Sequence, residues 1–435
     1  MEVGQTVKVP ENAKVIDAKG KTITPGLVAI SMRGIGIRST PTGKEKLADA
    51  LDPFDRNMKY SLGVGITTGC IELSSGRGGR SRRRNEGEPA EMFLGFEQPV
   101  QEFVTEAMLD YGDQDTSLCP CCGLPVLPTE PITPARPTQE QARKMAVIKM
   151  SYGNLDAMLT KESVFYSPPP GALNGALNRH NWRRDIKQAR ESMKEKEKST
   201  AEATKKTSNA TSSKTPAANT TKTAKPKSTA SKVKPELISL LKRETAMRIR
   251  ANSVDEIRDM VDLANELGYD IVIEGAIEGW VLAQELGASE VSVIYTPRQR
   301  REAQRDRKED SGSFIESTGI FEEAGVPFAI ATLSNSISTN GLAGRDLTSL
   351  ALEAAFAVRG GADERTALQA VTIVPARMMG LEDKIGSIEV GKDADILILN
   401  GSPLDYRTYV EQAIVAGKLA YDRAEDRVYP VFDRE

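Results

Sequence analysis

The sequence predicts an α/β fold in which helices and strands alternate along most of the chain. Between residues 235 and 325, segments with the 3.6-residue spacing of amphipathic helices alternate with short apolar runs such as 270–275 and 291–295. Residues 366–400 continue this pattern as a helix, a turn and a strand pair. At 435 residues the chain is long enough for one large barrel or for two to three ordinary domains. Such alternation implies parallel βαβ units, arranged as a barrel or as a doubly wound sheet.

Composition limits the possible classes of protein. The hydrophobic fraction of 39% and the mean hydropathy of −0.38 are low, which indicates that part of the chain is unfolded. A net charge of −3 argues against a generally basic nucleic-acid binder. The sequence has no apolar run of membrane-spanning length and no signal-peptide core at its start, and its four cysteines do not form a secreted disulfide framework. We therefore expect a cytoplasmic protein without membrane partners.

The stretch 366–400 is the most informative part of the chain. Helical spacing over residues 367–371 ends near Pro375, where a helix cannot easily continue, and a second short helix follows. Gly380 suits the left-handed position at the end of that helix. We expect residues 385–390 to form an alternating strand, which a tight turn connects to an apolar strand at 395–399.

These motifs resemble a known family. The segment T-I-V-P-A-R followed by GLEDKIGSIEVGKDADILIL resembles the C-terminal end of the amidohydrolase superfamily, particularly its imidazolonepropionase-like and dihydroorotase-like branches. VIDAKGKTITPGL near the N-terminus resembles the entry into that family's first barrel strand. The resemblance selects the barrel: it implies a TIM-type (β/α)8 barrel and a small β-sandwich built from both chain ends.

Domain boundaries follow from this resemblance. We assign residues 25–381 to the barrel, and residues 1–24 together with 382–435 to the small composite β domain. Two short strands are expected at 7–9 and 15–16. Because the family carries more sandwich strands before this point, the small domain is expected to be truncated at its N-terminus, or the true start lies upstream. The Lys/Thr/Ser/Ala-rich segment 194–234 has almost no large apolar residue, so we expect a disordered insertion in the barrel.

The family's metal ligands are expected at the ends of the barrel strands. Its histidines in H-x-H, R-x-H-A-H-like and E-H-like motifs, together with an aspartate after the last strand, bind divalent metal such as zinc and activate a water. Asparagine in place of the aspartate keeps the shape but cannot accept a proton from that water. In this chain the six aligned positions hold other residues, namely Ser31, Arg33, Arg250, Asn252, Gly275 and Asn335.

The replacements predict a pseudoenzyme. One histidine in the whole chain, His180, cannot supply a site that needs several neutral imidazoles, so no metal cofactor is expected in the barrel. The chain is then expected to act as a structural or regulatory partner of another protein. The resemblance implies that it assembles either as a homo-oligomer or as a hetero-oligomer with an active relative. Arg33 and Arg250 would occupy the space of the missing cation, Glu274 would neutralise one of them, and the surplus charge would bind a small organic anion.

Two other functions remain open. The first is an active hydrolase of non-peptide carbon–nitrogen bonds that uses an unrecognised metal-free site, with Lys149, Glu274, Asp346 or His180 as candidates. The second is an anion or nucleic-acid binding module that uses the Gly/Arg loop 74–88 and the Lys-rich insertion, although the acidic net charge makes nucleic acid the less favoured partner.

The cysteines offer a weak metal-site candidate outside the barrel. Cys119, Cys121 and Cys122 lie close together in sequence and could provide half of a structural zinc site. A tetrahedral site needs about four ligands, and the chain offers only Cys70 and His180 as further soft donors. Cys70 lies in an apolar run and is expected to be a buried core residue.

Overall fold

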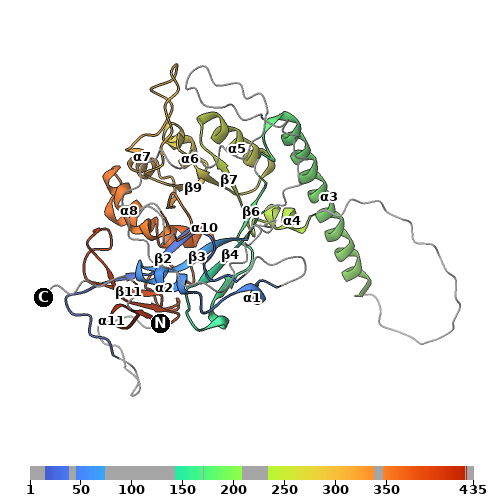
Figure 1. Cartoon of the computed structure of the whole chain (residues 1–435). Helices are drawn as coiled ribbons and strands as arrows, with labels where there is room; N and C mark the ends of the chain where they lie inside the picture. Colours follow the sequence, from blue (N-terminus) through green and yellow to red (C-terminus); the bar gives the residue numbers. More distant parts are fainter. Residues whose placement is uncertain are drawn as a thin grey trace, which may run out of the picture. The chain divides into compact units, whose positions relative to one another are not determined.

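The structure is a computed structural model that describes residues 15–38, 46–73, 143–169, 171–207, 234–337, 346–426 and 428. These residues form a nine-stranded mixed sheet, a four-stranded antiparallel sheet and the helices around them (Figure 1). The predicted strand at 7–9, the Gly/Arg loop and the three clustered cysteines lie outside the described residues. None of the described helices combines the length and the apolar character needed to cross a membrane.

Eight strands of the large sheet follow one path of neighbours. In order they are β10 (Phe328–Ile330), β9 (Ser292–Tyr295), β8 (Ile271–Gly275), β7 (Ala246–Ala251), β6 (Phe165–Ser167), β4 (Arg143–Lys149), β3 (Ile66–Leu73) and β2 (Leu27–Met32). A short strand, β5 (Leu159–Lys161), pairs with β4 off this path. All neighbours on the path are parallel except at β4, which is antiparallel to both β3 and β6.

The direction of β4 departs from the predicted run of parallel βαβ units. This strand runs opposite to both of its neighbours on the path. Between β4 and β6 the chain has only the one-turn helix η1 (Leu155–Ala157) and β5, and a short connection of this kind suits antiparallel strands. As a result, Met145 lies beside the carboxyl ends of the parallel strands, while Lys149 lies toward their amino ends.

The two end strands of this sheet approach each other. β2 contacts β10, and between them residue 371 is hydrogen-bonded to β2 while residue 370 is hydrogen-bonded to β10. The Val28 amide donates to the Val371 carbonyl at 2.8 Å, and the Ile330 amide donates to the Ala370 carbonyl at 2.9 Å. Among the described residues no strand ladder joins β2 directly to β10. The sheet is therefore curled, with residues 370–371 between its ends.

Alternating residues of the strands fill the two faces of the sheet. Cys70 and Val272 belong to an inner apolar cluster, while their neighbours Ile71 and Ile273 pack in a larger outer cluster against the helices. α10 (Ile373–Met378) contributes Ala376 to the inner cluster. The interior of the curled sheet is thus a packed core, and polar chemistry is restricted to the strand ends.

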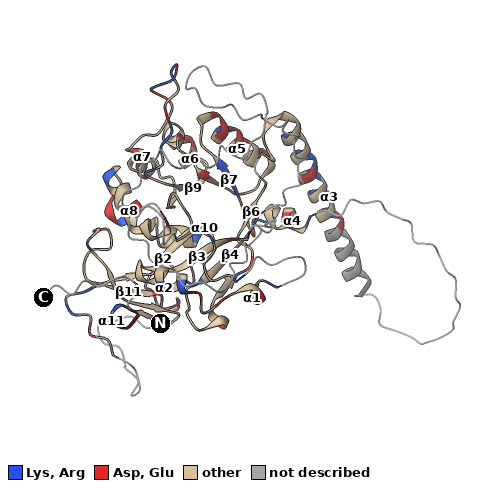
Figure 2. Cartoon of the chain, viewed as in Figure 1, with Lys and Arg blue, Asp and Glu red and all other residues tan. Residues whose placement is uncertain are grey.

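The remaining helices lie around the two sheets (Figure 1). They are α1 (Leu47–Ala50), α2 (Arg56–Gly63), α3 (Gly175–Thr207), α4 (Pro235–Leu241), α5 (Val254–Leu267), α6 (Ala283–Ala288), α7 (Ser317–Glu323), α8 (Leu350–Arg359), α9 (Glu364–Gln369) and α11 (Arg423–Asp426), with the 3₁₀ turns η2 (Gly279–Leu282) and η3 (Leu347–Ser349). α5 has well-defined ends, since Ser253 and Glu256 form a capping box and Gly268 closes the helix at φ 63°. Acidic and basic residues both occur along α3 and α8, in line with the small net charge (Figure 2).

The second sheet joins strands from distant parts of the sequence. Its order is β1 (Thr22–Pro25), β11 (Ile396–Leu399), β12 (Val410–Val415) and β13 (Lys418–Asp422), with every neighbour antiparallel. The Gly26 amide donates to the Asp395 carbonyl at 2.9 Å. The buried Lys149 ammonium lies 2.6 Å from Asp393 and 2.8 Å from Asp395, so an ion triad ties β4 to the start of β11.

The C-terminal stretch contains two corrections. Residues 385–390 do not form a strand, because Gly386 adopts φ 91° and a Cβ there would lie 2.8 Å from the Ile373 Cα. Pro375 does not end a helix but lies in the first turn of α10, where a missing amide proton costs nothing. The left-handed conformation of Gly380 is confirmed, with φ 62°. The apolar strand expected at 395–399 is also confirmed, as β11.

Two further expectations were wrong. Residues 15 and 16 are not in a strand, and Val15 is exposed. α3 continues to Thr207, past the predicted start of disorder at Lys194, and residues 208–233 lie outside the described part. The first half of α3 is packed, since Trp182 stacks on Tyr166 with ring centroids 5.7 Å apart.

Candidate functional site

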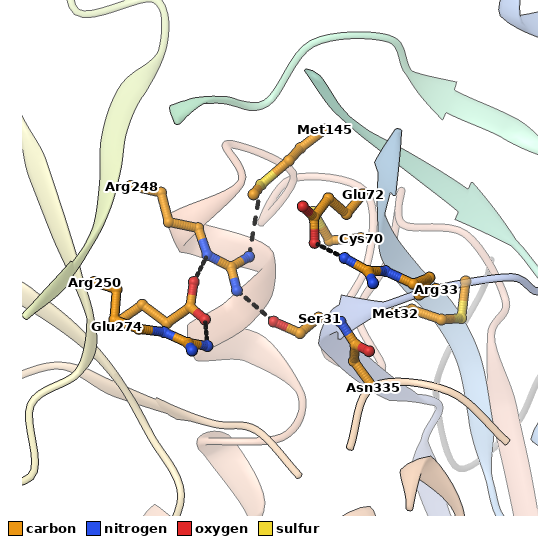
Figure 3. Close-up of a pocket in the computed structure, with 10 residues that line it drawn as sticks. All are labelled: Ser31, Met32, Arg33, Cys70, Glu72, Met145, Arg248, Arg250, Glu274 and Asn335. Atoms are coloured by element: carbon orange, nitrogen blue, oxygen red, sulfur yellow. Dashed lines mark hydrogen bonds and ion pairs between the residues drawn. The ribbon is translucent and has the colours of Figure 1, made fainter. Parts of the chain in front are cut away.

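A polar pocket lies where the parallel strands of the large sheet end. It has a volume of about 250 Å³ and opens among the ends of β2, β3, β7 and β8. Figure 3 shows the ten residues that line it, which are Ser31, Met32, Arg33, Cys70, Glu72, Met145, Arg248, Arg250, Glu274 and Asn335. In α/β barrels this end of the strands is where functional sites are built.

The floor of the pocket is a buried guanidinium group, that of Arg248 on β7. Its side chain is 4% exposed. Its Nε donates to Glu274 at 2.8 Å and its Nη1 to the Ile30 carbonyl at 2.9 Å, while its Nη2 donates to the Ser31 hydroxyl (Figure 3). The group also lies over the Phe165 ring, 5.7 Å from its centroid. Arg248 therefore links the ends of β2, β7 and β8 through a fixed positive charge.

Glu274 bridges two arginines. It lies opposite Arg250 in the parallel register of β7 and β8, and one carboxylate oxygen accepts from the Arg250 Nη2 at 2.6 Å while the other accepts from Arg248. Burial by itself raises the pKa of Glu274, but the charges and hydrogen bonds of the two arginines outweigh burial and lower the pKa from 4.5 to about 2. The carboxyl group is therefore ionised at neutral pH and has almost no basicity.

A second ion pair lies on the other side of the pocket. The Arg33 Nη2 donates to Glu72 at 2.9 Å, with side-chain exposures of 53% and 12%. The Arg33 amide donates to the Asn335 carbonyl at 2.8 Å, which holds Asn335 beside the end of β2. The pocket thus contains three arginines and two carboxylates, and each carboxylate is paired with arginine.

Cys70 also lines the pocket, but its burial argues against a role as nucleophile. The residue is 1% exposed, as expected for a core cysteine. Burial raises the pKa of its thiol to about 11, and the nearby charge of Arg248 lowers the pKa only in part. Because the thiolate is the reactive form, this sulfur is inert at neutral pH.

The structure brings together four of the six positions aligned with metal ligands. Ser31, Arg33, Arg250 and Asn335 line the pocket. Asn252 and Gly275 do not line it but lie against each other, since a Cβ on Gly275 would fall 2.2 Å from the Asn252 Oδ1. Gly275 also has φ 97°, so its backbone conformation requires glycine.

The four residues considered for a metal-free site do not lie together in one pocket. Glu274 lines the pocket, whereas Lys149 lies opposite Thr68 on β3, about 13 Å along the strand from Glu72. Asp346 is buried at the start of η3, where it accepts from the Thr348 amide at 3.2 Å. His180 is exposed on α3.

Sequence reasoning missed Arg248 and Glu72. Arg248 was not among the predicted site residues. It lies two residues before Arg250 on the same strand, so its side chain faces the same side of the sheet. Glu72 stands in the same relation to Cys70 near the end of β3. For Arg248 the available signal was a pair of arginines at i and i+2 on one strand, and for Glu72 it was a charged residue near the end of an apolar strand.

Comparison with known proteins agrees with this fold. Residues 289–426 match the Amidohydrolase family. Imidazolonepropionases from Streptococcus sanguinis (strain SK36) and Streptococcus gordonii (strain Challis) are each 28% identical over 193 residues, which is 39% of this chain. The aligned part spans 45% of the length of these relatives. An amidohydrolase structure from Thermotoga maritima MSB8 is similar over 97% of this chain and 92% of its own, with a TM-score of 0.60 and 20% identity.

The similarity to the Thermotoga structure shows a fold of the TIM-barrel type with an additional small β domain. The family match over residues 289–426 and the streptococcal relatives show that this chain is similar to the amidohydrolase superfamily. The family resemblance stated from the sequence motifs is therefore confirmed.

Proposed function

We propose that this amidohydrolase-like protein holds no divalent metal in its pocket and acts as a non-catalytic structural or regulatory partner. The buried guanidinium of Arg248 carries this proposal. A divalent cation at the strand ends would be repelled by that fixed positive charge across a short distance. Both carboxylates of the pocket already pair with arginine, and no three His, Cys, Asp or Glu side chains within the described ranges converge as metal ligands. The residues present do not fit the metal that the family implies.

Two polar groups of the pocket, those of Glu274 and Asn335, are poorly suited to act as a base in hydrolysis. Attack by water needs a group that accepts its proton near neutral pH. Glu274 has a pKa of about 2, and the Asn335 amide is not basic. Of the residues considered for a metal-free hydrolase, Glu274 alone lines the pocket. Assembly with further copies or with an active relative belongs to the same proposal.

Metal analysis tests the proposal. Protein purified after expression in zinc- and manganese-supplemented medium is expected to contain less than about a tenth of an equivalent of either metal, because one fixed cation already occupies the strand ends. Elemental analysis by plasma mass spectrometry measures this directly.

The control is a Cys119/Cys121/Cys122→Ser variant prepared in parallel. Metal that disappears in this variant belongs to the cysteines and leaves the proposal intact. Close to one equivalent that survives the cysteine changes would contradict the proposal and move the hydrolase function to first place.

The surplus positive charge of the pocket supports a second part of the proposal, the binding of a small organic anion. Arg33 and Arg250 are both about half exposed or more, at 53% and 71%, so solvent and a ligand can reach them. Guanidinium groups match carboxylates and phosphates in geometry and charge.

A further inference from the structure

The two exposed arginines of the pocket are alike in how they are held. Arg33 uses its Nη2 for Glu72, and Arg250 uses its Nη2 for Glu274. Within the described part of the chain, Nε and Nη1 of both side chains make no other hydrogen bond or ion pair. Each arginine is thus fixed by one nitrogen and keeps donors available to a ligand.

These two arginines lie on opposite sides of the pocket. Arg33 follows β2 and Arg250 is on β7, strands that are separated along the sheet by β3, β4 and β6. Figure 3 shows the two guanidinium groups apart, with Ser31 and the Arg248 guanidinium between them. Arg248 directs its donors to protein groups and is buried, so it supports the floor and does not reach outward.

Two neutral polar side chains also line the pocket. The Ser31 hydroxyl accepts from Arg248 and retains its own proton for donation, and the Asn335 side chain offers both a donor and an acceptor. A ligand that spans the pocket therefore meets an exposed guanidinium at each end, with the Ser31 hydroxyl and the buried guanidinium of Arg248 between them. The cavity of about 250 Å³ restricts such a ligand to a short chain.

We propose that the pocket binds a short dianion with one acidic group at each end, such as a dicarboxylate, one end on Arg33 and the other on Arg250. This inference rests on the proposed function, because a divalent metal among the same residues would change the charge of the site. A monoanion engages only one of the two arginines and leaves the other with its carboxylate partner. Two anionic groups on one centre, as in inorganic phosphate, also reach only one side.

Isothermal titration of malonate, succinate, glutarate, butyrate and inorganic phosphate into the intact protein at low ionic strength tests the inference. The best dicarboxylate is expected to bind at least about tenfold more tightly than butyrate, since one more charge-assisted contact separates them. Phosphate is expected to bind about as weakly as butyrate. Equal affinity for dicarboxylates and butyrate, or tighter binding of phosphate, would overturn the inference.

Variants assign the two ends. Arg33→Ala and Arg250→Ala are each expected to reduce dicarboxylate affinity to that of butyrate, a loss of about tenfold. Arg258→Ala removes a surface arginine that pairs with Glu285 on α6 and is expected to change nothing. An unchanged dicarboxylate affinity in either pocket variant would also overturn the inference. Glu72→Gln keeps the shape of the site and frees Arg33, so tighter binding is expected.

Metal analysis of the same samples separates the two proposals. Metal-free protein without a preference for dicarboxylates contradicts only the dianion site. Dicarboxylate binding that is lost on removal of bound metal by a chelator contradicts the proposed function instead.

Discussion

Replacing Arg248 with alanine is expected to lower the free energy of unfolding by about 3–5 kcal/mol. The substitution removes a buried charge that joins Glu274, the Ile30 carbonyl and the Ser31 hydroxyl. It leaves Glu274 with only the exposed Arg250 as its counter-ion and leaves a cavity beside Phe165. Urea denaturation followed by circular dichroism measures the loss.

Arg250→Ala is the matched control for this prediction. It removes the second arginine from the same carboxylate, but its side chain is 71% exposed, so a loss below about 1 kcal/mol is expected. A double variant, Arg248→Met with Glu274→Leu, replaces the pair by apolar groups of similar size and is expected to recover most of the stability. The prediction fails if Arg248→Ala costs no more than Arg250→Ala.

The second large effect is expected from Glu274→Gln and depends on pH. The pKa of Glu274 is about 2 in the folded protein, against an ordinary value of 4.5. A lowered carboxyl pKa stabilises the folded state at pH values above 4.5, and this contribution is lost as the pH falls towards 2. At pH 7 we expect the variant to be less stable than the wild type by about 3 kcal/mol. The difference should narrow steadily below pH 4.5.

Urea denaturation of both proteins at pH 7, 4.5 and 3 checks this expectation. Glu266→Gln provides a control at an ion pair with Arg183, in which both side chains are exposed. Solvent screens that pair, so its variant should show a much smaller difference from the wild type at every pH. A Glu274→Gln difference that stays constant from pH 7 to pH 3 would rule out the lowered pKa as its cause.

The helices and strands could be predicted from the sequence where hydrophobic periodicity and stop signals agree. The periodic segments between residues 235 and 325 gave the correct helices and strands, because each carries its own apolar face and its own stop signals. The errors fall where a distant contact decides. Residues 385–390 alternate like a strand, yet Gly386 packs against Ile373 and turns the chain. The direction of β4 likewise depends on which neighbours it pairs with.

The candidate site divides in the same way. The resemblance to the amidohydrolase superfamily was readable from the sequence alone. That arginine, serine, asparagine and glycine replace metal ligands follows from this resemblance and stays a prediction. The sequence also located Arg33, Arg250 and Glu274 as charged residues near strand ends. These statements need only residue identity and order along the chain.

Only the tertiary structure decided which of these side chains share one pocket and which charge lies at its floor. Arg248 reaches Ile30 and Ser31, more than two hundred residues away in sequence, because the sheet curls β2 and β7 toward a common interior. Burial then distinguishes Arg248 from Arg250, two residues further along the same strand. Arg248 is buried, so its charge must be paired with a carboxylate to offset desolvation. Arg250 extends into solvent, where its free N–H groups can meet a ligand.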